Sequence, residues 1–348
     1  MMKIAMILPS LANKGPGIVV KELCSELIKN GHDCDIYYFD NINELKMPCK
    51  TYNISFNEKI DFNNYDIIHS HMFRPDLYVW WHLIKRKKRI KTKTITTLHN
   101  PIHYSALRKD YSILQSIVGS FLWKKSLKVF NHIVTLNEDT YNQIKKDFTK
   151  VSIIHNGMNI SQSNSIDPQD KIKIEELKKR YKIIGSISGI IKRKGLDQII
   201  NALPYLKDFA FVAVGDGEDL DRLKKLSCSL NVEDRCLWLG NKYNAHNYNS
   251  YFDIFIMCSY SEGYPLALIE AAAYGKPTVL SNIKILKSII SNKEVVFYKL
   301  NDIEDLIKAI RTVDNNCEYF SENIFNYYKS HLTANIMTCN YVNIYNKL

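Results

Sequence analysis

The chain has 348 residues, 46% of them apolar, and a formal net charge of +11. A single core usually stops growing below this length, so we expect two domains of roughly 150 to 180 residues. No stretch approaches the roughly 18 to 20 consecutive apolar residues of a membrane-spanning helix, and the eight scattered cysteines favour a reduced cytosolic protein over a disulfide framework or a zinc site.

The excess positive charge belongs to the first half of the chain: residues 1–165 carry +9, and residues 166–348 carry +2. Much of the excess lies in "IKRKKRIKTK" (84–93). Within it, we assign Arg86, Lys87, Lys88 and Arg89 to the side of the protein that meets an acceptor or a membrane. A basic cluster is commonly a solvated face, but it also suits an anionic membrane surface, which attracts each Lys or Arg by roughly 1 kcal/mol. Nucleic acid fits less well, because no aromatic residues are interleaved.

Strand-like and helix-like segments alternate through the first half. The opening run "KIAMIL" (3–8) could pass for a short signal peptide, but Pro9 and the glycine-rich turn behind it favour a buried parallel strand. A helix with apolar residues at helical spacing follows and ends before Gly31. Further strands are expected at 35–39, 66–70, 93–98, 132–136 and 151–154. This alternation is typical of a doubly wound parallel sheet.

The polar, turn-rich stretch 158–170 has no periodicity, and the alternation restarts after it. We therefore predict an N-terminal Rossmann-like domain over 1–160 and a C-terminal one over 161–330, with a C-terminal helix at about 331–348 that packs back on the first domain. Ligands of such sheets bind at the carboxyl ends of the strands, so a cleft between the two domains is expected to hold the site.

Three glycine-bearing turns follow predicted strands. In "SISGIIKRKGLDQII", the cations Lys192, Arg193 and Lys194 crowd a turn before Gly195, and a helix N-terminus with added cations suits a diphosphate. Three basic residues at a turn are also often merely solvated.

The turn "NKGPGIVV" places Gly15 and Gly17 at the end of the first strand, where close approach to a ligand is favoured. "VGDGEDL" reads equally well as a tight turn that needs a positive φ. None of the three is a P-loop.

Two carboxylates flank the start of an apolar helix in "SEGYPLALIEAAAYGKP" (261–277). Pro265 is expected to be the first helical residue, which places Glu262 just outside the helix and Glu270 inside it. A charged carboxylate among apolar neighbours is costly unless it is paired. Glu270 therefore either points to solvent or meets hydroxyls or a cation in the cleft.

The run "SYSEGYPLALIEAAAYGKPTVLS" resembles the signature of the family 4 retaining glycosyltransferases, in which two Glu residues eight apart bracket an aromatic-Pro turn. "IKRKGLDQIINAL", "VGDGEDLDRLKKL", "DIIHSH", "TTLHN" and "IIHNGMN" also fit that family in order, so the resemblance covers nearly the whole chain. It implies the GT-B fold, with a nucleotide-sugar held mainly by the second Rossmann-like domain and an acceptor held mainly by the first.

The resemblance also implies roles for individual residues. Glu270 would bind the ribose hydroxyls, Glu262 the hydroxyls of the transferred sugar, and Lys194 the diphosphate leaving group, while His99 would lie against the donor sugar near the reacting carbon. The remaining donor contacts would come from Gly15, Gly17, Arg193, Gly263, Tyr264, Pro265 and Leu266. One departure is Gly189, which stands where many members carry an Arg, so Arg193 or Lys192 would have to compensate. For His99 the alternative is a strand-end histidine bonded to backbone.

From the resemblance we expect a retaining transfer from a nucleoside diphosphate sugar, a UDP-sugar rather than a GDP-sugar, to a saccharide hydroxyl on a polyprenyl-diphosphate carrier. We recognise no Asp-x-Asp metal site and expect no metal or other cofactor. The basic cluster and the amphipathic stretch 111–130 would place a cytoplasmic protein peripherally at the anionic inner face of the cell membrane, with surface polysaccharide such as O-antigen or capsule as the product. For that stretch the alternative is a plain core helix.

Two rival functions remain open from the sequence. A nucleotide-sugar 2-epimerase shares the fold but would act on the donor alone. A nucleic-acid-binding protein would rest on the positive charge alone and would show a steep salt dependence of affinity.

Overall fold

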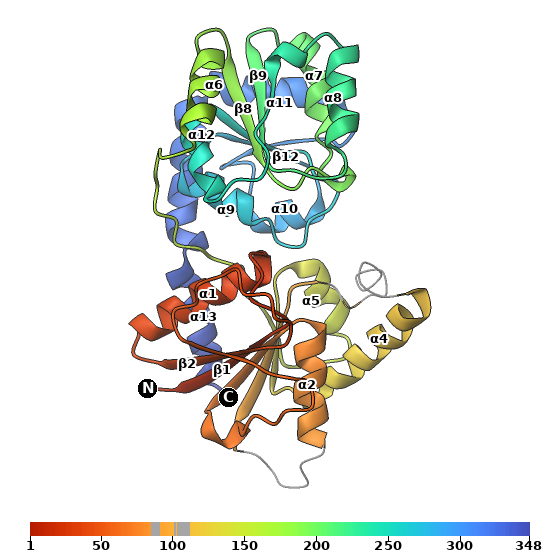
Figure 1. Ribbon diagram of the computed structural model, residues 1–348, viewed down its shortest axis with the longest axis vertical. Helices are drawn as coiled ribbons and strands as arrows, with labels where there is room; N and C mark the ends of the chain where they lie inside the picture. Colours follow the sequence, from red (N-terminus) through yellow and green to blue (C-terminus); the bar gives the residue numbers. More distant parts are fainter. Residues whose placement is uncertain (85–90, 101, 103–111) are drawn as a thin grey trace. The chain divides into compact units, whose positions relative to one another are not determined.

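The computed structural model describes residues 1–84, 91–100, 102 and 112–348. The chain forms two compact units, one of Met1–Asn159 with Thr333–Leu348 and one of Ile160–Leu332. Each unit is built around its own parallel sheet flanked by helices (Figure 1). The prediction of two parallel-sheet α/β domains is therefore confirmed.

The sheet of the first unit runs in the order β3-β2-β1-β4-β5-β6-β7 among the described residues. Its strands are β1 (Lys3–Leu8), β2 (Asp33–Tyr38), β3 (Lys50–Asn53), β4 (Ile67–His71), β5 (Lys93–Leu98), β6 (His132–Thr135) and β7 (Val151–Ile153). Neighbouring strands pair in parallel, and the order reverses between β1 and β4. A doubly wound sheet binds its ligands outside this switch point, at the carboxyl ends of the strands.

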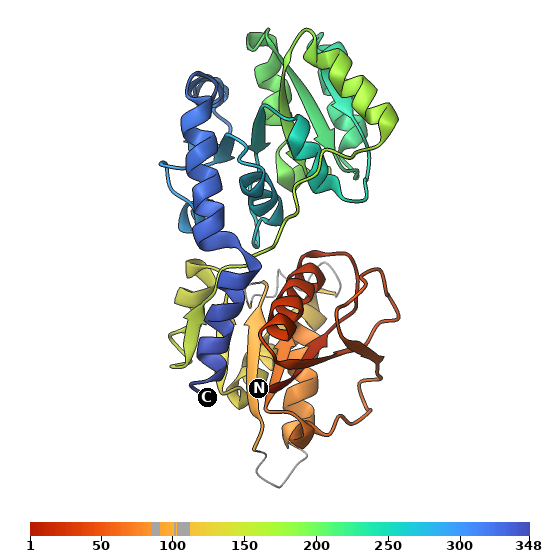
Figure 2. The same cartoon turned by 90° about the vertical axis from the view of Figure 1, so that its left-hand side faces the viewer.

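Helices cover both faces of this sheet, which explains why β1 is apolar after Lys3: residues 4–8 are fully buried. The helices are α1 (Gly15–Lys29), α2 (Phe73–Ile84), α4 (Ile113–Ser126), α5 (Glu138–Ile144) and α13 (Ala334–Tyr345). The last of them, α13, comes from the C-terminal end of the chain and packs beside α1 (Figure 2). The short strand β3 was not predicted, because its four residues are all exposed and carry no apolar pattern.

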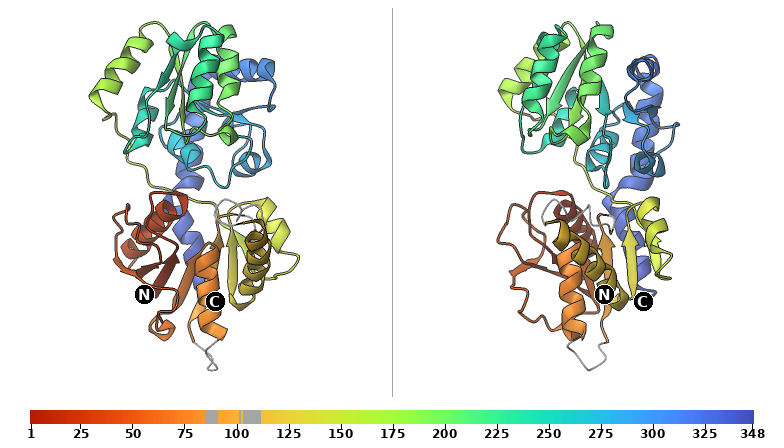
Figure 3. Two further views of the ribbon diagram at one scale, coloured as in Figure 1. Left: turned by 45° about the vertical axis from the view of Figure 1, so that its right-hand side comes forward. Right: turned by 90° about the vertical axis from the view of Figure 1, so that its right-hand side faces the viewer.

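The second unit, coloured green to blue in Figure 3, is also built around one parallel sheet. The strand order of this sheet is β10-β9-β8-β11-β12-β13. Its strands are β8 (Lys182–Ile187), β9 (Phe209–Val214), β10 (Cys236–Trp238), β11 (Ile254–Met257), β12 (Thr278–Ser281) and β13 (Val296–Tyr298). This unit reverses its order between β8 and β11, so its expected ligand position lies outside these two strands.

The helices of the second unit enclose a core of mostly aliphatic side chains. They are α6 (Pro168–Lys178), α7 (Asp197–Ala202), α8 (Leu220–Ser229), α9 (Leu266–Ala273), α10 (Lys284–Ile289), α11 (Ile303–Asn315) and α12 (Cys317–Tyr327). Helix α9 begins at Leu266, one residue later than predicted, because Pro265 has an extended conformation at the N-cap (φ −84°, ψ 92°). A π-helical turn, Tyr328–Leu332, follows α12.

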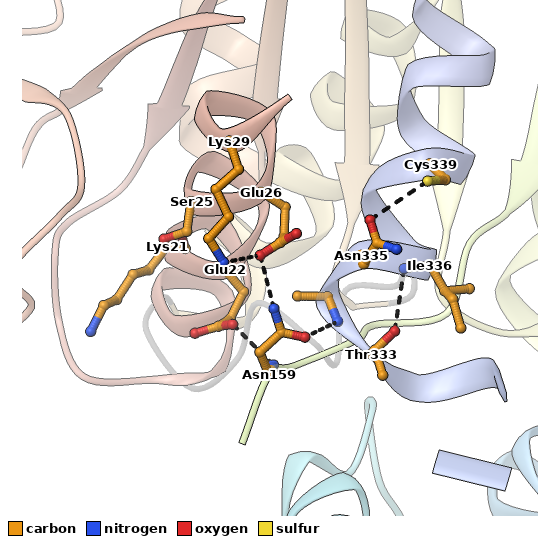
Figure 4. Close-up of polar contacts among 11 residues, drawn as sticks. Lys21, Glu22, Ser25, Glu26, Lys29, Asn159, Thr333, Asn335, Ile336 and Cys339 are labelled. Carbon is orange, nitrogen blue, oxygen red and sulfur yellow. Dashed lines mark hydrogen bonds and ion pairs between the residues drawn. The ribbon is translucent and has the colours of Figure 1, made fainter. Parts of the chain in front are cut away.

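The chain leaves the first unit and re-enters it beside one residue, Asn159 (Figure 4). Its backbone N–H donates to Glu22 (3.0 Å) and its Nδ2 to Glu26 Oε1 (2.9 Å), while its Oδ1 accepts from the backbone N–H of Ala334 (3.2 Å). Gly157 passes so close that a Cβ there would lie 2.1 Å from the carbonyl oxygen of Thr333. Asn159 thus connects α1 both to the segment that leaves the first unit and to the segment that re-enters it at Thr333.

Within the described residues, no helix is both long and apolar enough to cross a bilayer.

Candidate active site

The loops after β8 and β11 meet at the switch point of the second unit. Gly195 ends the turn after β8 with φ +61°, and a Cβ there would lie 2.4 Å from the carbonyl oxygen of Cys258. The backbone N–H of Tyr260 donates to the carbonyl of Arg193 at 2.9 Å. A glycine is needed at this position both for the left-handed conformation and for the close approach of the two loops.

This approach brings Lys194 and Glu262 together, 68 residues apart in the chain. Lys194 Nζ lies 2.6 Å from Glu262 Oε1, which also accepts from Ser259 Oγ at 2.5 Å, and Arg193 Nη1 lies 3.4 Å from Glu262 Oε2. The side chains of Lys194 and Glu262 are only 16% and 6% exposed. An ammonium has three N–H donors, so Lys194 keeps donors for an anionic ligand beyond the one that faces Glu262.

The guanidinium of Arg193 is held by the same loop. It donates to the backbone carbonyl of Ser261 as well as to Glu262, and its side chain is 35% exposed. Lys192 is exposed, and a Cβ at Gly189 would meet only the carbonyl oxygen of Asp216, at 3.9 Å. Arg193 is therefore the second cation that the structure places beside Lys194.

Glu270 occupies the middle of α9, among Leu268, Ile269 and three buried alanines. Its carboxylate is partly buried, and among the described residues it has no hydrogen-bond or ion-pair partner. Desolvation raises the pKa of Glu270 to about 7. A carboxylate that is desolvated and left without a donor is suited to a ligand that brings hydroxyl groups with it.

The residues between the two carboxylates form the entry to α9. Gly263 and Tyr264 are partly buried in the loop, Pro265 is the N-cap, and Leu266 is the first helical residue. No side chain caps this helix N-terminus, so its first backbone N–H groups remain available to a ligand oxygen. The predicted donor residues of this segment thus lie on one short stretch between Glu262 and Glu270.

The first unit has a pocket of about 410 Å³ at its own switch point. It is lined by the loop after β1, including Pro9, Lys14 and Gly17, and by Met72 and Arg74 after β4. Gly15 opens α1, and a Cβ at Gly17 would lie 2.7 Å from the carbonyl oxygen of Ala12. Met72 has φ +76°, a conformation that costs about 1–3 kcal/mol in a residue other than glycine and that accumulates at functional sites.

His99 follows β5 beside this pocket, whose lining includes the next residue, Asn100. Among the described residues, the His99 side chain has no backbone partner: its Nε2 lies 3.1 Å from Nδ1 of His71, a residue for which no role was predicted from the sequence. Burial lowers the pKa of His99 to about 4, so its imidazole is neutral at pH 7.

A buried carboxylate also holds this unit together. Asp76 is fully buried and accepts from Ser70 Oγ (2.6 Å), Thr96 Oγ1 (2.7 Å) and Trp123 Nε1 (2.7 Å). Desolvation raises its pKa to about 7, against the lowering effect of these three donors. Trp123 lines the pocket, so Asp76 fixes one of its walls. Sequence reasoning missed this residue, since a lone Asp in an amphipathic helix gives no signal.

In helix α4, within the stretch 111–130, most of the large apolar side chains face solvent and most of the buried residues are small, which is the reverse of a core helix. Its buried residues are Ser116, Gly119, Trp123 and Ser126, of which only Trp123 is large and apolar. Its exposed residues include Ile113, Leu114, Ile117, Val118 and Phe121, each 49–73% exposed. The structure therefore does not agree with the plain core helix considered as an alternative. Helix α4 lies at the periphery of the first unit (Figure 1).

Two expectations from the sequence need comment. The basic residues Arg86, Lys87, Lys88 and Arg89 lie outside the described residues. The chain does contain two Asp-x-Asp triplets, at 33–35 and 219–221. Asp35 accepts from Tyr65 (2.8 Å) and Asp219 is held by Arg222 (2.6 and 2.7 Å), so one carboxylate of each triplet already has a protein partner.

Two family models match the chain. "Glycosyltransferase Family 4" matches residues 14–162, and "Glycosyl transferases group 1" matches residues 167–326. The O-antigen biosynthesis glycosyltransferase WclY of Escherichia coli is 28% identical over 100% of this chain and 99% of its own length. A UDP-Gal:alpha-D-GlcNAc-diphosphoundecaprenol alpha-1,3-galactosyltransferase of E. coli is 28% identical over 79% of this chain and 72% of its own.

Solved structures show the same fold. HepE of Anabaena, crystallised with UDP and glucose, superposes with a TM-score of 0.80 over 100% of both chains at 13% identity. Sucrose-phosphate synthase of Thermosynechococcus elongatus superposes with a TM-score of 0.76 over 100% of this chain and 99% of its own, at 15% identity. At these identities the likeness shows the fold alone, which is that of the GT-B enzymes.

Proposed function

The chain belongs to family 4 of the glycosyltransferases, and from this premise we propose that it moves a sugar from a nucleoside diphosphate donor to a saccharide hydroxyl with retention of anomeric configuration. The observation that carries the proposal is the Lys194–Glu262 pair at the switch point of the second unit. A transferred sugar leaves a diphosphate behind, and the charge that develops on it must be stabilised. Lys194 and Arg193 supply two cations at this point.

In the proposed complex, Glu262 has two functions. Its Oε1 receives Lys194 and Ser259, which fixes the position of the ammonium, while the carboxylate also accepts from hydroxyls of the transferred sugar. Groups that are pre-positioned in this way need no reorganisation when charge develops on the leaving group. The pair therefore couples recognition of the sugar to stabilisation of the diphosphate.

Glu270 is proposed to bind the ribose of the nucleotide. An ionised carboxylate can accept from both ribose hydroxyls, and the absence of a described protein partner leaves both of its oxygens available. The unpaired N-terminus of α9, with Gly263, Tyr264, Pro265 and Leu266 at its entry, is proposed to supply backbone donors to the donor substrate.

We assign the reaction to surface polysaccharide synthesis, as the names of the two E. coli relatives suggest. We propose a UDP-sugar as donor and a saccharide on a polyprenyl diphosphate as acceptor. The test is transfer from UDP-galactose, UDP-glucose or UDP-N-acetylglucosamine to undecaprenyl-diphosphate-linked N-acetylglucosamine, followed by mass spectrometry. Consumption of the donor without any acceptor product, seen as an epimeric sugar nucleotide, would favour an epimerase instead.

The acceptor domain is proposed to dock on the anionic inner face of the cell membrane through α4. The exposed face Ile113, Leu114, Ile117, Val118 and Phe121 supports this, because burying one large apolar side chain contributes about 1.5–3 kcal/mol. Lys125 and Lys128 follow on the same segment and are exposed, each adding about 1 kcal/mol beside anionic headgroups. Lys124 is exposed as well, but its ammonium is paired with Asp147 at 2.8 Å.

Flotation with phosphatidylglycerol-containing vesicles tests the docking. The wild type should float at low salt, and the double variant Ile117→Asp with Phe121→Asp should stay at the bottom of the gradient. Tyr243→Asp is the matched control, since Tyr243 is 88% exposed but lies in the second unit. Equal flotation of the double variant and the control would rule out α4 as the docking face.

Finally, we propose that the transfer needs no metal ion, because Lys194 and Arg193 already supply positive charge to the leaving group. Protein treated with EDTA should retain its activity. A loss of activity that Mg²⁺ or Mn²⁺ restores would refute this account of the leaving group.

A further inference from the structure

Behind the pocket of the first unit, a chain of buried side chains connects α13 to His99. Both ring nitrogens of His69 form hydrogen bonds to hydroxyl groups. Nδ1 lies 2.7 Å from Tyr345 Oη, and Nε2 lies 2.8 Å from Thr97 Oγ1. Thr97 Oγ1 in turn lies 2.9 Å from Tyr341 Oη. The ring of His71 packs against that of His69 in a tilted arrangement, with centroids 4.1 Å apart and an interplanar angle of 33°. His71 contacts His99 through its Nδ1.

From this arrangement we propose that His71 is a positioning residue that holds His99 in the tautomer with its proton on Nδ1, so that His99 presents an N–H donor to the ligand. The tyrosines of α13 act one step further back by fixing His69, on which His71 rests. The consequence for catalysis rests on the proposed function, whereas the tautomer is a property of the free protein.

The direction of the His71–His99 hydrogen bond follows from the partners of His71. Its Nε2 is buried and has no hydrogen-bond partner in the part of the chain that the structure describes. If that atom carried the proton, the protein would contain a buried N–H without an acceptor. Among backbone groups such an N–H is rarer than an under-satisfied acceptor, and we apply the same preference to this imidazole. The proton of His71 therefore belongs on Nδ1, from which it donates to His99 Nε2.

This direction determines the chemistry of His99. A neutral imidazole has one donor and one acceptor nitrogen, so accepting at Nε2 places the His99 proton on Nδ1. Burial lowers the pKa values of all three histidines, of His69 to about 3 and of His99 to about 4, so the rings are neutral at pH 7. Nδ1 of His99 has no partner among the described residues. It is free to donate to a sugar hydroxyl or a phosphate oxygen, but it does not accept.

Two buried positions of α13, 341 and 345, carry tyrosine, although phenylalanine would fill the same space. The reason is that both tyrosine hydroxyls form hydrogen bonds. Tyr341 and Tyr345 are 1% and 3% exposed, and each directs its hydroxyl to the histidine–threonine cluster. A buried hydroxyl without a partner costs about 1–3 kcal/mol, so these two tyrosines are compatible only with polar groups at the positions of His69 and Thr97. The C-terminal segment thus completes the support of His99.

The direct test is NMR spectroscopy of the substrate-free protein with histidines labelled with 15N and 13C, in which the ring shifts report the tautomer. The His99 resonances are assigned by their loss in His99→Gln. The expected result is protonation at Nδ1 of His99 at pH 7. Protonation at Nε2 would overturn the proposal, whether or not the protein transfers sugar.

Two replacements of His71 test the mechanism of positioning. His71→Asn keeps a donor near the position of Nδ1, and His71→Leu has none. In His71→Leu, His99 should change to the Nε2–H tautomer that histidine favours in water, and kcat/KM should fall about two- to ten-fold, as expected for one lost hydrogen bond. His71→Asn should retain the Nδ1–H tautomer and most of the activity. Equal losses in the two variants would contradict the proposal.

Tyr345→Phe tests the outer part of the chain through a double-mutant cycle. If Tyr345 acts through His71, Tyr345→Phe lowers kcat in the wild-type background but has no further effect in His71→Leu. Additive losses would show that α13 affects activity by another route. The thermal midpoint of each variant, measured in parallel, separates these effects from simple destabilisation.

Discussion

The titration of Glu270 gives a sharp prediction for donor binding. Its pKa is raised to about 7 by desolvation, and only the ionised carboxylate can accept from both ribose hydroxyls. About one tenth of the free protein is ionised at this position at pH 6 and about nine tenths at pH 8. The affinity for the donor should therefore rise about ten-fold between these two pH values.

Isothermal titration calorimetry with UDP-glucose measures this effect, because a sugar-esterified diphosphate does not itself titrate between pH 6 and 8. Glu270→Gln should bind more weakly at pH 8, by about ten- to a hundred-fold, as expected for hydrogen bonds to a charged group. Its affinity should also be nearly independent of pH. A wild-type affinity that does not change with pH, or a variant that keeps the pH dependence, would refute the assignment of Glu270 to the ribose.

The same titration affects stability with a defined sign. Because the folded-state pKa of Glu270 lies above its ordinary value of 4.5, the folded protein holds the proton longer than the unfolded chain does. The contribution of this group to the free energy of unfolding is therefore present below about pH 4.5 and is lost as the pH rises through about 7. Glu270→Gln should be more stable than the wild type at pH 8 and nearly equal to it at pH 4.5, as measured by urea denaturation.

Three further predictions follow from the contacts. Lys194→Ala should lower kcat by about 10²- to 10³-fold, with the circular dichroism spectrum unchanged; full activity would remove Lys194 from the site. Asp76→Asn should lower the free energy of unfolding by about 1–3 kcal/mol, since an amide cannot accept from all of Ser70, Thr96 and Trp123, and urea denaturation that shows no loss would contradict this reading. Asn159→Ala should cost about 1–2 kcal/mol through its bonds to Glu26 and Ala334, whereas the exposed control Asn63→Ala should be near neutral.

Much of the fold was predictable because its signals are local. The continuous apolar run of β1 and the alternation of strands and helices follow from burial on both faces of a parallel sheet. Lys194 and Glu262 were each singled out from the sequence, but only the resemblance assigned them to one site. Their contact depends on two loops 68 residues apart that meet at Gly195 and Cys258, which no local pattern reveals.

The remaining features depend on long-range packing. His71, Asp76 and Tyr345 each look like ordinary members of a strand or helix, and their functions appear only when β4, β5, α4 and α13 are assembled. The reversed polarity of α4 is also invisible in the sequence, because periodicity shows that a helix has an apolar face but not which way that face turns. Asn159 likewise gains its role from two chain crossings that lie 174 residues apart.

The central claim is that the second unit binds a nucleoside diphosphate sugar and that the protein transfers the sugar with retention. The most direct measurement is the anomeric configuration, by NMR spectroscopy, of the product formed from an α-linked UDP-sugar and undecaprenyl-diphosphate-linked N-acetylglucosamine, with Lys194→Ala as control. The account predicts an α-linked product from the wild type and almost none from Lys194→Ala. A β-linked product, or equal transfer by the two proteins, would contradict it.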